Sequence, residues 1–235
     1  MGTSASKFVP EVTATTLKAG MPTVVDVKFA KSITKVLINL TSLQTGRHWM
    51  VWLPDGFHGP IIFHDGPTNA DPIMMVVHHE NKRGTKFAVK LPESPNEKRG
   101  PRSETFTWVC GLAKNELYWF EIDVGYETSR RTERFEWRRS HGSEVESLNM
   151  ATWGWKLVMK PSLPRRQSIG KQPHLRSMGF ASDGGEVVAV WGSSHGLNNL
   201  GHFELQGRGK TGELGESFIL MALASSLTIE CNNYQ

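Results

Sequence analysis

The densest group of chemically active side chains in this sequence is cationic. Five arginines lie within ten consecutive positions, and two glutamates partly offset them: Arg130, Arg131, Arg134, Arg138 and Arg139. A second basic group lies where no acidic residue occurs, between Glu146 and Asp183: Lys156, Lys160, Arg165, Arg166, Lys171 and Arg176. Each basic residue near an anionic membrane surface contributes about 1 kcal/mol to binding. The pattern predicts binding of anionic lipid or another polyanion, and the alternative is a solvated face without a ligand.

A possible acyl acceptor at the start of the chain points the same way. Residues 1–6 (MGTSAS) fit the pattern for myristoylation of Gly2, and the alternative is a chance match in a run of small residues. A single myristoyl chain binds membranes only marginally, and a basic cluster is the second signal that makes binding stable. We therefore expect a cytoplasmic protein that is peripheral at the membrane.

A glycine-rich segment offers a weaker anion site. Residues 207–212 (GRGKTG) match the spacing of a dinucleotide-binding turn, but the residues after Gly212 leave no room for a second strand–helix–strand unit. A turn that lets the last strand reverse into a helix explains the glycines better. Arg208 and Lys210 remain candidates for binding a phosphate at the start of that helix.

Catalytic and metal-binding patterns are sparse. His58, His64, His78 and His79 do not complete a ligand set, and Cys110 and Cys231 are not spaced for zinc. Two cysteines also indicate a reducing compartment rather than a disulfide scaffold. No nucleophile motif is present, so we expect no catalytic residue, no metal and no cofactor. A cofactor-independent enzyme, of the cyclase or isomerase type, would leave little trace in the sequence and stays open.

The elements that must position these residues are short strands with turns between them. The expected strands are residues 23–30, 35–41, 49–53, 60–64, 74–79, 86–91, 105–112, 117–124, 134–139, 153–160, 186–191 and 202–206. Several alternate with period two, as in 134–139, where Phe135 and Trp137 take one face and Arg134 and Arg138 the other. This pattern predicts antiparallel strands with a buried aromatic face. Inward-facing aromatic rings cannot stack on bases, so nucleic-acid binding is disfavoured.

One segment breaks the strand pattern. Residues 214–229 (LGESFILMALASSLTI) are apolar nearly all round and too short to cross a bilayer as a helix. A helix without a polar face must be buried on every side. We expect it inside a barrel, and a final buried strand is the alternative.

This arrangement resembles a known family. A barrel of about twelve strands around a hydrophobic C-terminal helix is similar to the Tubby C-terminal fold, which LURP-one-like proteins and phospholipid scramblases share. The segments 135–142 (FEWRRSHG) and 184–190 (GGEVVAV) look like parts of that fold. The resemblance implies a mainly β, closed antiparallel barrel, and phosphoinositide binding is known in the family. We expect a flexible N-terminus over residues 1–20 and one domain over 21–235, with its central helix at about 214–229.

Composition fits an ordinary globular domain and leaves function open. Hydrophobic residues make up 38% of the chain and charged residues 21%, which excludes disordered and fibrous classes. The leading hypothesis is non-catalytic binding of anionic lipid or a membrane surface through a basic sheet face. The second is an enzyme that acts on a hydrophobic small molecule in a barrel pocket of about 300 Å³ or more. The third is a protein-interaction module with an exposed apolar patch. The sequence leaves the oligomeric state open.

Overall fold

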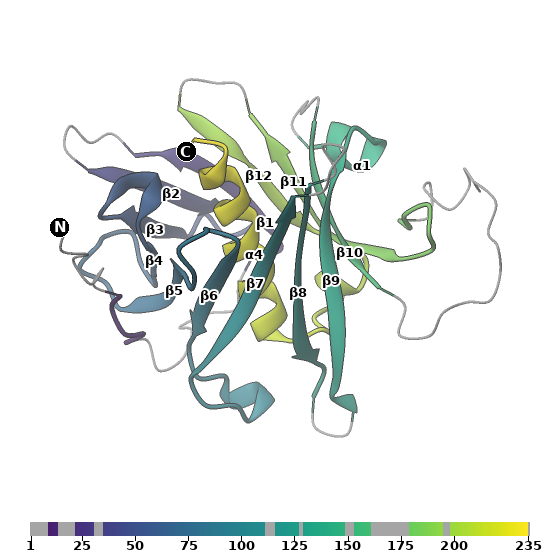
Figure 1. Cartoon of the computed structure of the whole chain (residues 1–235), viewed down its shortest axis with the longest axis horizontal. Coiled ribbons are helices and arrows are strands. Elements are labelled where there is room, and N and C mark those ends of the chain that lie inside the picture. Colours follow the sequence, from purple (N-terminus) through teal and green to yellow (C-terminus); the bar gives the residue numbers. More distant parts are fainter. Residues whose placement is uncertain are drawn as a thin grey trace.

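Twelve antiparallel strands close into one barrel in the computed structural model of the chain (Figure 1). The structure describes residues 9–13, 22–30, 35–110, 116–126, 129–148, 153–160, 179–194 and 198–234. The strands are β1 (Val24–Phe29), β2 (Val36–Ser42), β3 (His48–Leu53), β4 (Ile61–His64), β5 (Ile73–His79), β6 (Lys86–Leu91), β7 (Arg102–Cys110), β8 (Glu116–Val124), β9 (Arg131–Ser140), β10 (Gly154–Met159), β11 (Glu186–Ser193) and β12 (Asn199–Leu205). Each expected strand overlaps one of these, so the mainly β fold class is confirmed.

The strand order explains how the sheet closes. Each strand pairs with its neighbours in sequence, and β12 pairs antiparallel with β1. Successive strands of a meander alternate in direction, so an even number leaves the last strand antiparallel to the first. Closure pairs the edges that an open sheet exposes to aggregation.

Inward-facing aromatic side chains line the barrel wall, which the strands form. Phe120, Phe135 and Trp137 are fully buried, and Phe120 and Phe135 stack with ring centroids 5.3 Å apart. The alternation in the sequence identified these positions because the pleat sends successive side chains to opposite faces of a strand. Four of the eight tryptophans, Trp49, Trp137, Trp155 and Trp191, are buried and serve packing.

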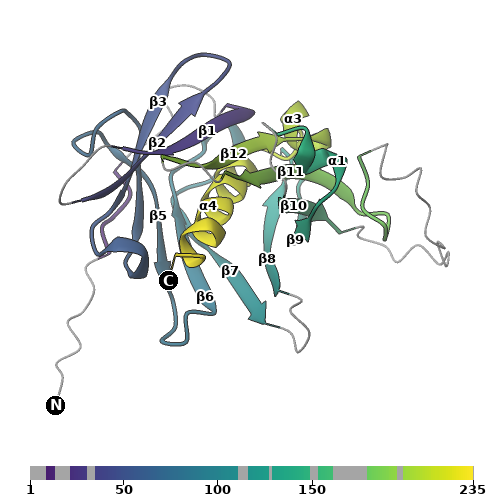
Figure 2. The same cartoon turned by 90° about the horizontal axis from the view of Figure 1, so that it is seen from above.

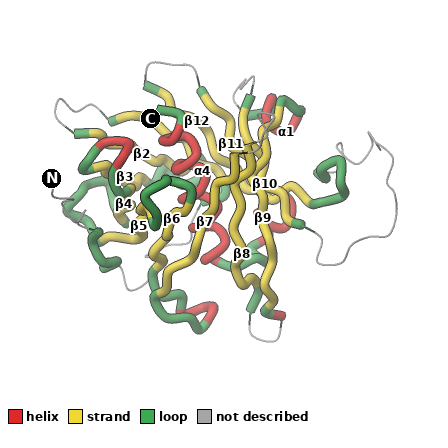
Figure 3. The backbone as a smooth tube through the Cα atoms, viewed as in Figure 1, coloured by secondary structure: helices red, strands yellow, loops and turns green. Residues whose placement is uncertain are grey.

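The helix α4 (Glu216–Asn232) runs through the barrel (Figures 1 and 2). Most of its residues are buried, which confirms the expected central helix and excludes the final-strand alternative. Its start lies two residues later than expected and its end three residues later. Figure 3 shows the strands as a shell around this helix.

Hydrogen bonds from side chains of the strands connect α4 with the wall. The Trp137 Nε1–H donates to Ser225 Oγ over 2.8 Å, and the Trp191 Nε1–H donates to the Glu230 carboxylate over 3.0 Å. Both helix residues are buried. The polar atoms of α4 that face the wall therefore have partners, as buried polar groups require.

Short helices cover part of the outer surface. The helix α1 (Ser143–Glu146) and the following turn cover β11, where Leu148 packs with Val187 and Val190 in a second small core. The helix α3 (Gly207–Thr211) lies against the same strand. The turns η1 (Gly56–His58) and η2 (Pro95–Glu97) complete the regular elements of the described residues.

Part of the N-terminal segment contacts the barrel. The Thr13 backbone N–H donates to the Ile73 carbonyl over 3.0 Å, and Lys90 Nζ lies 2.6 Å from the Glu11 carboxylate. Residues 9–13 therefore touch β5 and β6. Residues 1–8 and 14–21, which make up most of the expected flexible N-terminus, lie outside the described residues.

Candidate functional site

The outward face of β9 and β10 brings together basic residues that are distant in sequence. The register pairs Lys156 directly with Arg138, so their side chains leave the sheet on the same side. Lys160 follows at the end of β10, and its backbone N–H donates to the Arg134 carbonyl over 2.9 Å. The basic residues of the two segments could form a common patch only if β9 and β10 were neighbours, and these two strands do pair.

Acidic side chains occupy the same face. Arg138 Nη2 lies 2.6 Å from the Glu136 carboxylate and 2.9 Å from Asp183. Lys160 Nζ lies 3.3 Å from the Asp183 carboxylate. Desolvation raises the pKa of Asp183, but hydrogen bonding to Arg138 and the charge of Arg138 outweigh it and hold this pKa well below its ordinary value. Asp183 stays ionised and bound to its two cations at neutral pH.

Further ion pairs complete this surface. Lys156 Nζ lies 2.9 Å from Glu144, and Arg134 Nε lies 3.2 Å from Glu136. Arg134 also stacks over the Trp119 ring at 4.1 Å from its centroid and lies 3.7 Å from Glu121. We call this surface the ion-paired face; it consists of Arg134, Arg138, Lys156, Lys160, Glu121, Glu136, Glu144 and Asp183. Its four cations meet four anions, so it is close to neutral.

The other arginines of the first group lie elsewhere. Arg130 donates to the Glu97 carbonyl over 2.6 Å, and Arg131 pairs with Glu133, both at the start of β9. Arg139 lies near the other end of β9 and pairs with Glu116. Eight residues of strand place Arg131 and Arg139 about 26 Å apart. Five arginines that are close in sequence therefore do not form one site.

Several predicted site residues cannot be placed. Gly2, Arg165 and Arg166 lie outside the described residues. The two arginines belong to the segment 161–178, which follows β10 in the sequence and precedes the turn before β11. Their charges are known from the sequence, and their contacts are not described.

The glycine-rich segment serves packing. Gly209 lies on α3 so close to β11 that an added Cβ would be 2.2 Å from the Val188 carbonyl oxygen. Gly212 ends α3 with a φ of 82°, in the left-handed region that favours glycine. These positions therefore need glycine for close approach and for the turn into α4.

The predicted phosphate-binding residues are not grouped at the start of α4. The Arg208 guanidinium is held 2.6 Å from the Glu186 carboxylate, and Lys210 is exposed on the five-residue helix α3. The Glu97 carboxylate instead accepts the Ser217 backbone N–H at the start of α4, over 2.9 Å. The sequence did not single out Glu97, because it comes from a connection about 120 residues earlier.

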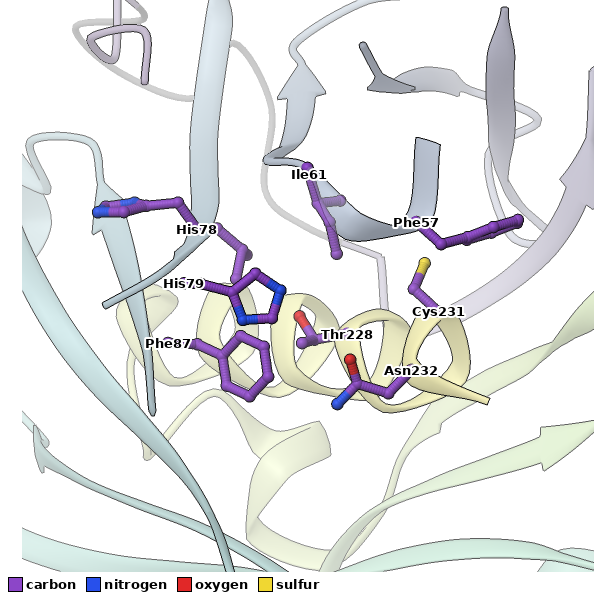
Figure 4. A pocket seen from close by; sticks show the side chains of 10 residues that line it. Phe57, Ile61, His78, His79, Phe87, Thr228, Cys231 and Asn232 are labelled. Carbon is purple, nitrogen blue, oxygen red and sulfur yellow. The ribbon is translucent and has the colours of Figure 1, made fainter. Parts of the chain in front are cut away.

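The opposite end of α4 forms a small pocket, which we call the mouth pocket. It encloses about 220 Å³, including space open to solvent. Its lining comes from η1, β4, β5, β6 and α4: Phe57, Gly59, Ile61, Val77, His78, His79, Phe87, Thr228, Cys231 and Asn232. Figure 4 shows His79, Phe87 and Thr228 grouped over the helix, while the His78 ring points away. The enclosed space itself has room for about one water-sized molecule, far less than the 300 Å³ that the enzyme hypothesis required.

Reactive groups near the mouth pocket do not form an evident nucleophile. Burial and the nearby Glu230 charge raise the pKa of the Cys231 thiol, so the thiol is protonated at neutral pH. Burial and the Lys90 charge lower the pKa of His78. Within the described ranges, no three His, Cys, Asp or Glu side chains are placed to hold a metal ion.

Two further observations concern surfaces. The large apolar side chains that are exposed in the described part of the chain are Leu43, Val109, Tyr126 and Tyr234, which lie on or beside different elements. None of the helices that the structure describes has the length and apolar character needed to cross a membrane.

No protein-family model matches the chain, and no curated protein or solved structure matches it either.

Proposed function

We propose that the protein binds anionic membrane surfaces without catalysis, and that the segment 161–178 supplies the attractive charge. The observation that carries this proposal is the distribution of charge along the chain. Residues 161–178 contain four basic residues and no acidic one: Arg165, Arg166, Lys171 and Arg176. The chain has 27 basic and 23 acidic residues, so the rest of it has no net charge.

The ion pairs refine the original hypothesis of a basic sheet face. Arg138 and Lys160 share Asp183, so an anionic lipid would have to compete with a carboxylate already in place. An exposed ion pair contributes little to stability, but it removes the net charge that attracts a distant anion. The unbalanced positive charge of the chain therefore lies in the segment 161–178 and not on the ion-paired face.

The barrel architecture agrees with a binding role. The interior is filled by α4, and the mouth pocket is smaller than a site for a drug-sized substrate. The closed barrel around a helix is also the architecture that the resemblance to Tubby-like proteins led us to expect. We propose further that the chain belongs to that family, that it binds anionic lipid and that Gly2 is acylated.

Vesicle sedimentation tests the proposal. The intact protein should bind vesicles of phosphatidylcholine with added phosphatidylserine and should not bind phosphatidylcholine alone. Replacing Arg165, Arg166, Lys171 and Arg176 by glutamine should weaken this binding about a hundredfold or more, since each cation contributes about 1 kcal/mol. Raising the salt concentration should weaken the binding of the intact protein, because salt screens exposed charges.

A matched variant separates position from total charge. Lys82, Arg83, Lys86 and Lys210 are exposed on other parts of the chain, and their replacement by glutamine removes the same net charge. This control should keep most of the binding. Equal loss in both variants, or equal binding to neutral and anionic vesicles, would contradict the proposal.

A further inference from the structure

Two short segments of the sequence combine a pair of basic residues with a hydroxyl side chain that follows at a fixed distance. They are residues 82–85 (KRGT) and 165–168 (RRQS), in which the second position after the basic pair is Thr85 or Ser168. A kinase that selects such substrates holds the two cations with acidic side chains of its own, which fixes the hydroxyl that follows them. The sequence therefore offers two candidate phosphorylation sites.

The structure places the first candidate in a tight hairpin. Thr85 ends the turn between β5 and β6, and its hydroxyl oxygen accepts the Asn81 side-chain amide over 2.9 Å. The Thr85 backbone N–H donates to Asn81 Oδ1 over 3.0 Å, and its carbonyl accepts the Trp108 backbone N–H of β7 over 2.8 Å. Phosphoryl transfer needs the hydroxyl in line with the phosphate of the donor, so Thr85 would first have to leave these bonds.

The second candidate belongs to a connection that supplies no strand of the barrel. β10 ends at Met159 and β11 begins at Glu186, and these two strands pair directly with each other. Twelve strands, all of them made of described residues, close the barrel, while Ser168 lies outside the described residues. A kinase that binds the residues around Ser168 therefore has no strand pairing of the described barrel to break.

A phosphate on Ser168 would change the charge on which the proposed membrane binding depends. The segment 161–178 has four basic residues and no acidic one, and two of the four, Arg165 and Arg166, lie within three positions of Ser168. A phosphoserine carries about 1.5 to 2 negative charges near neutral pH. The net positive charge of the segment would fall to about half. Phosphorylation releases basic clusters from anionic membranes for this reason.

We propose that an arginine-directed serine kinase phosphorylates Ser168 and that this modification releases the protein from anionic membranes. The γ-phosphoryl group of ATP passes to the Ser168 hydroxyl oxygen, and its bond to the β-phosphate oxygen breaks as the new O–P bond forms. ADP leaves, and the hydroxyl proton passes to a carboxylate of the kinase. This regulation rests on the proposed function, because it acts on the segment that supplies the attractive charge.

Phosphorylation of the folded, full-length chain tests the choice between the two sites. The protein is incubated with MgATP and the catalytic subunit of cyclic-AMP-dependent protein kinase, and mass spectrometry of its peptides locates the phosphate. We expect phosphate on Ser168, which Ser168→Ala abolishes and the matched variant Thr85→Ala leaves unchanged. Phosphate on Thr85 in place of Ser168, or no phosphate on Ser168, would overturn the proposal.

Vesicle sedimentation tests the effect on binding. The phosphorylated chain should bind vesicles of phosphatidylcholine with added phosphatidylserine about thirtyfold more weakly than the same chain after phosphatase treatment, because about two positive charges are compensated. Unmodified Ser168→Ala should bind as the unaltered chain does, since the serine hydroxyl carries no charge. The comparison before and after phosphatase treatment uses one chain, so it does not depend on the folding of a variant.

The outcomes separate the regulation from the function on which it rests. Equal binding of the phosphorylated and the phosphatase-treated chain would overturn the regulation and leave the proposed function standing. Absence of binding by the unmodified chain would overturn the proposed function and the regulation together.

Discussion

Ser225 shows how a single hydroxyl is accommodated in the centre of the barrel. It is fully buried, accepts the Trp137 indole N–H over 2.8 Å and donates to the Met221 carbonyl over 2.6 Å. Ser226, the next residue, is equally buried, and its hydroxyl donates to the Leu223 carbonyl of its own helix. The two serines therefore differ mainly in their contact with the barrel wall.

This difference leads to a prediction at the residue scale. Ser225→Ala leaves the Trp137 N–H buried without its acceptor, and we expect a loss of about 2 kcal/mol in the free energy of unfolding. Ser226→Ala leaves no donor of the wall unsatisfied and should cost less than about 1 kcal/mol. Urea denaturation of both variants measures the difference. Equal losses would mean that the bond between wall and helix contributes nothing.

At the scale of elements, the connection between β6 and β7 holds the start of α4. Glu97 in η2 accepts the Ser217 backbone N–H at Oε1, and Arg99 and Arg102 each approach its other oxygen, Oε2, to 3.7 Å. A carboxylate at this position stabilises the positive end of the helix. This connection therefore holds the start of α4.

Neutralising that carboxylate should loosen the helix. Glu97→Gln keeps an acceptor for Ser217 but leaves Arg99, whose side chain is only 9% exposed, without its nearest countercharge. We expect a loss of about 3 kcal/mol in unfolding free energy, typical of a broken buried ion pair. Glu104→Gln removes the more exposed partner of Arg102 and should cost less than about 1 kcal/mol. Thermal and urea unfolding measure both, and similar losses would contradict the assigned role of Glu97.

At the scale of the whole molecule, acidic groups connect strands and loops that are distant in sequence. Asp183 joins the turn before β11 to Arg138 and Lys160, and Glu144 of α1 holds Lys156 of β10. Desolvation raises the pKa values of both carboxyls, but the hydrogen bonds to these cations outweigh it and lower them. Ionised carboxylates thus stabilise the outer shell at neutral pH.

The sign of the pKa shifts predicts acid sensitivity. A carboxyl with a lowered pKa in the folded protein stabilises it above the unfolded pKa of about 4, and this contribution is lost as the pH falls below that value. Stability should fall from about pH 4 downward. Asp183→Asn should lower the melting temperature at pH 7 and reduce the acid-induced loss. Asp55→Asn, at an exposed turn, is the control. An unchanged pH profile in Asp183→Asn would contradict the prediction.

The sequence by itself determined the strands, the inward aromatic faces and the central helix. The alternation along the strands and the uniform apolarity of α4 are local properties of the sequence. The closed barrel meets both needs, because it buries α4 on every side and gives each strand an apolar layer on one face. The sequence also showed a stretch between Glu146 and Asp183 that carries six basic residues and no acidic one.

Only the tertiary structure decided which charges meet. Asp183 reaches Arg138 across 45 residues, Glu97 reaches Ser217 across 120, and the mouth pocket combines four strands and turns with the last turns of α4. Ion pairing depends on distances of a few ångströms, which the order of residues does not give. The pairing of the strands therefore divides the five arginines that are close in sequence. Two of them lie on the nearly neutral ion-paired face, and the others lie at the two ends of β9.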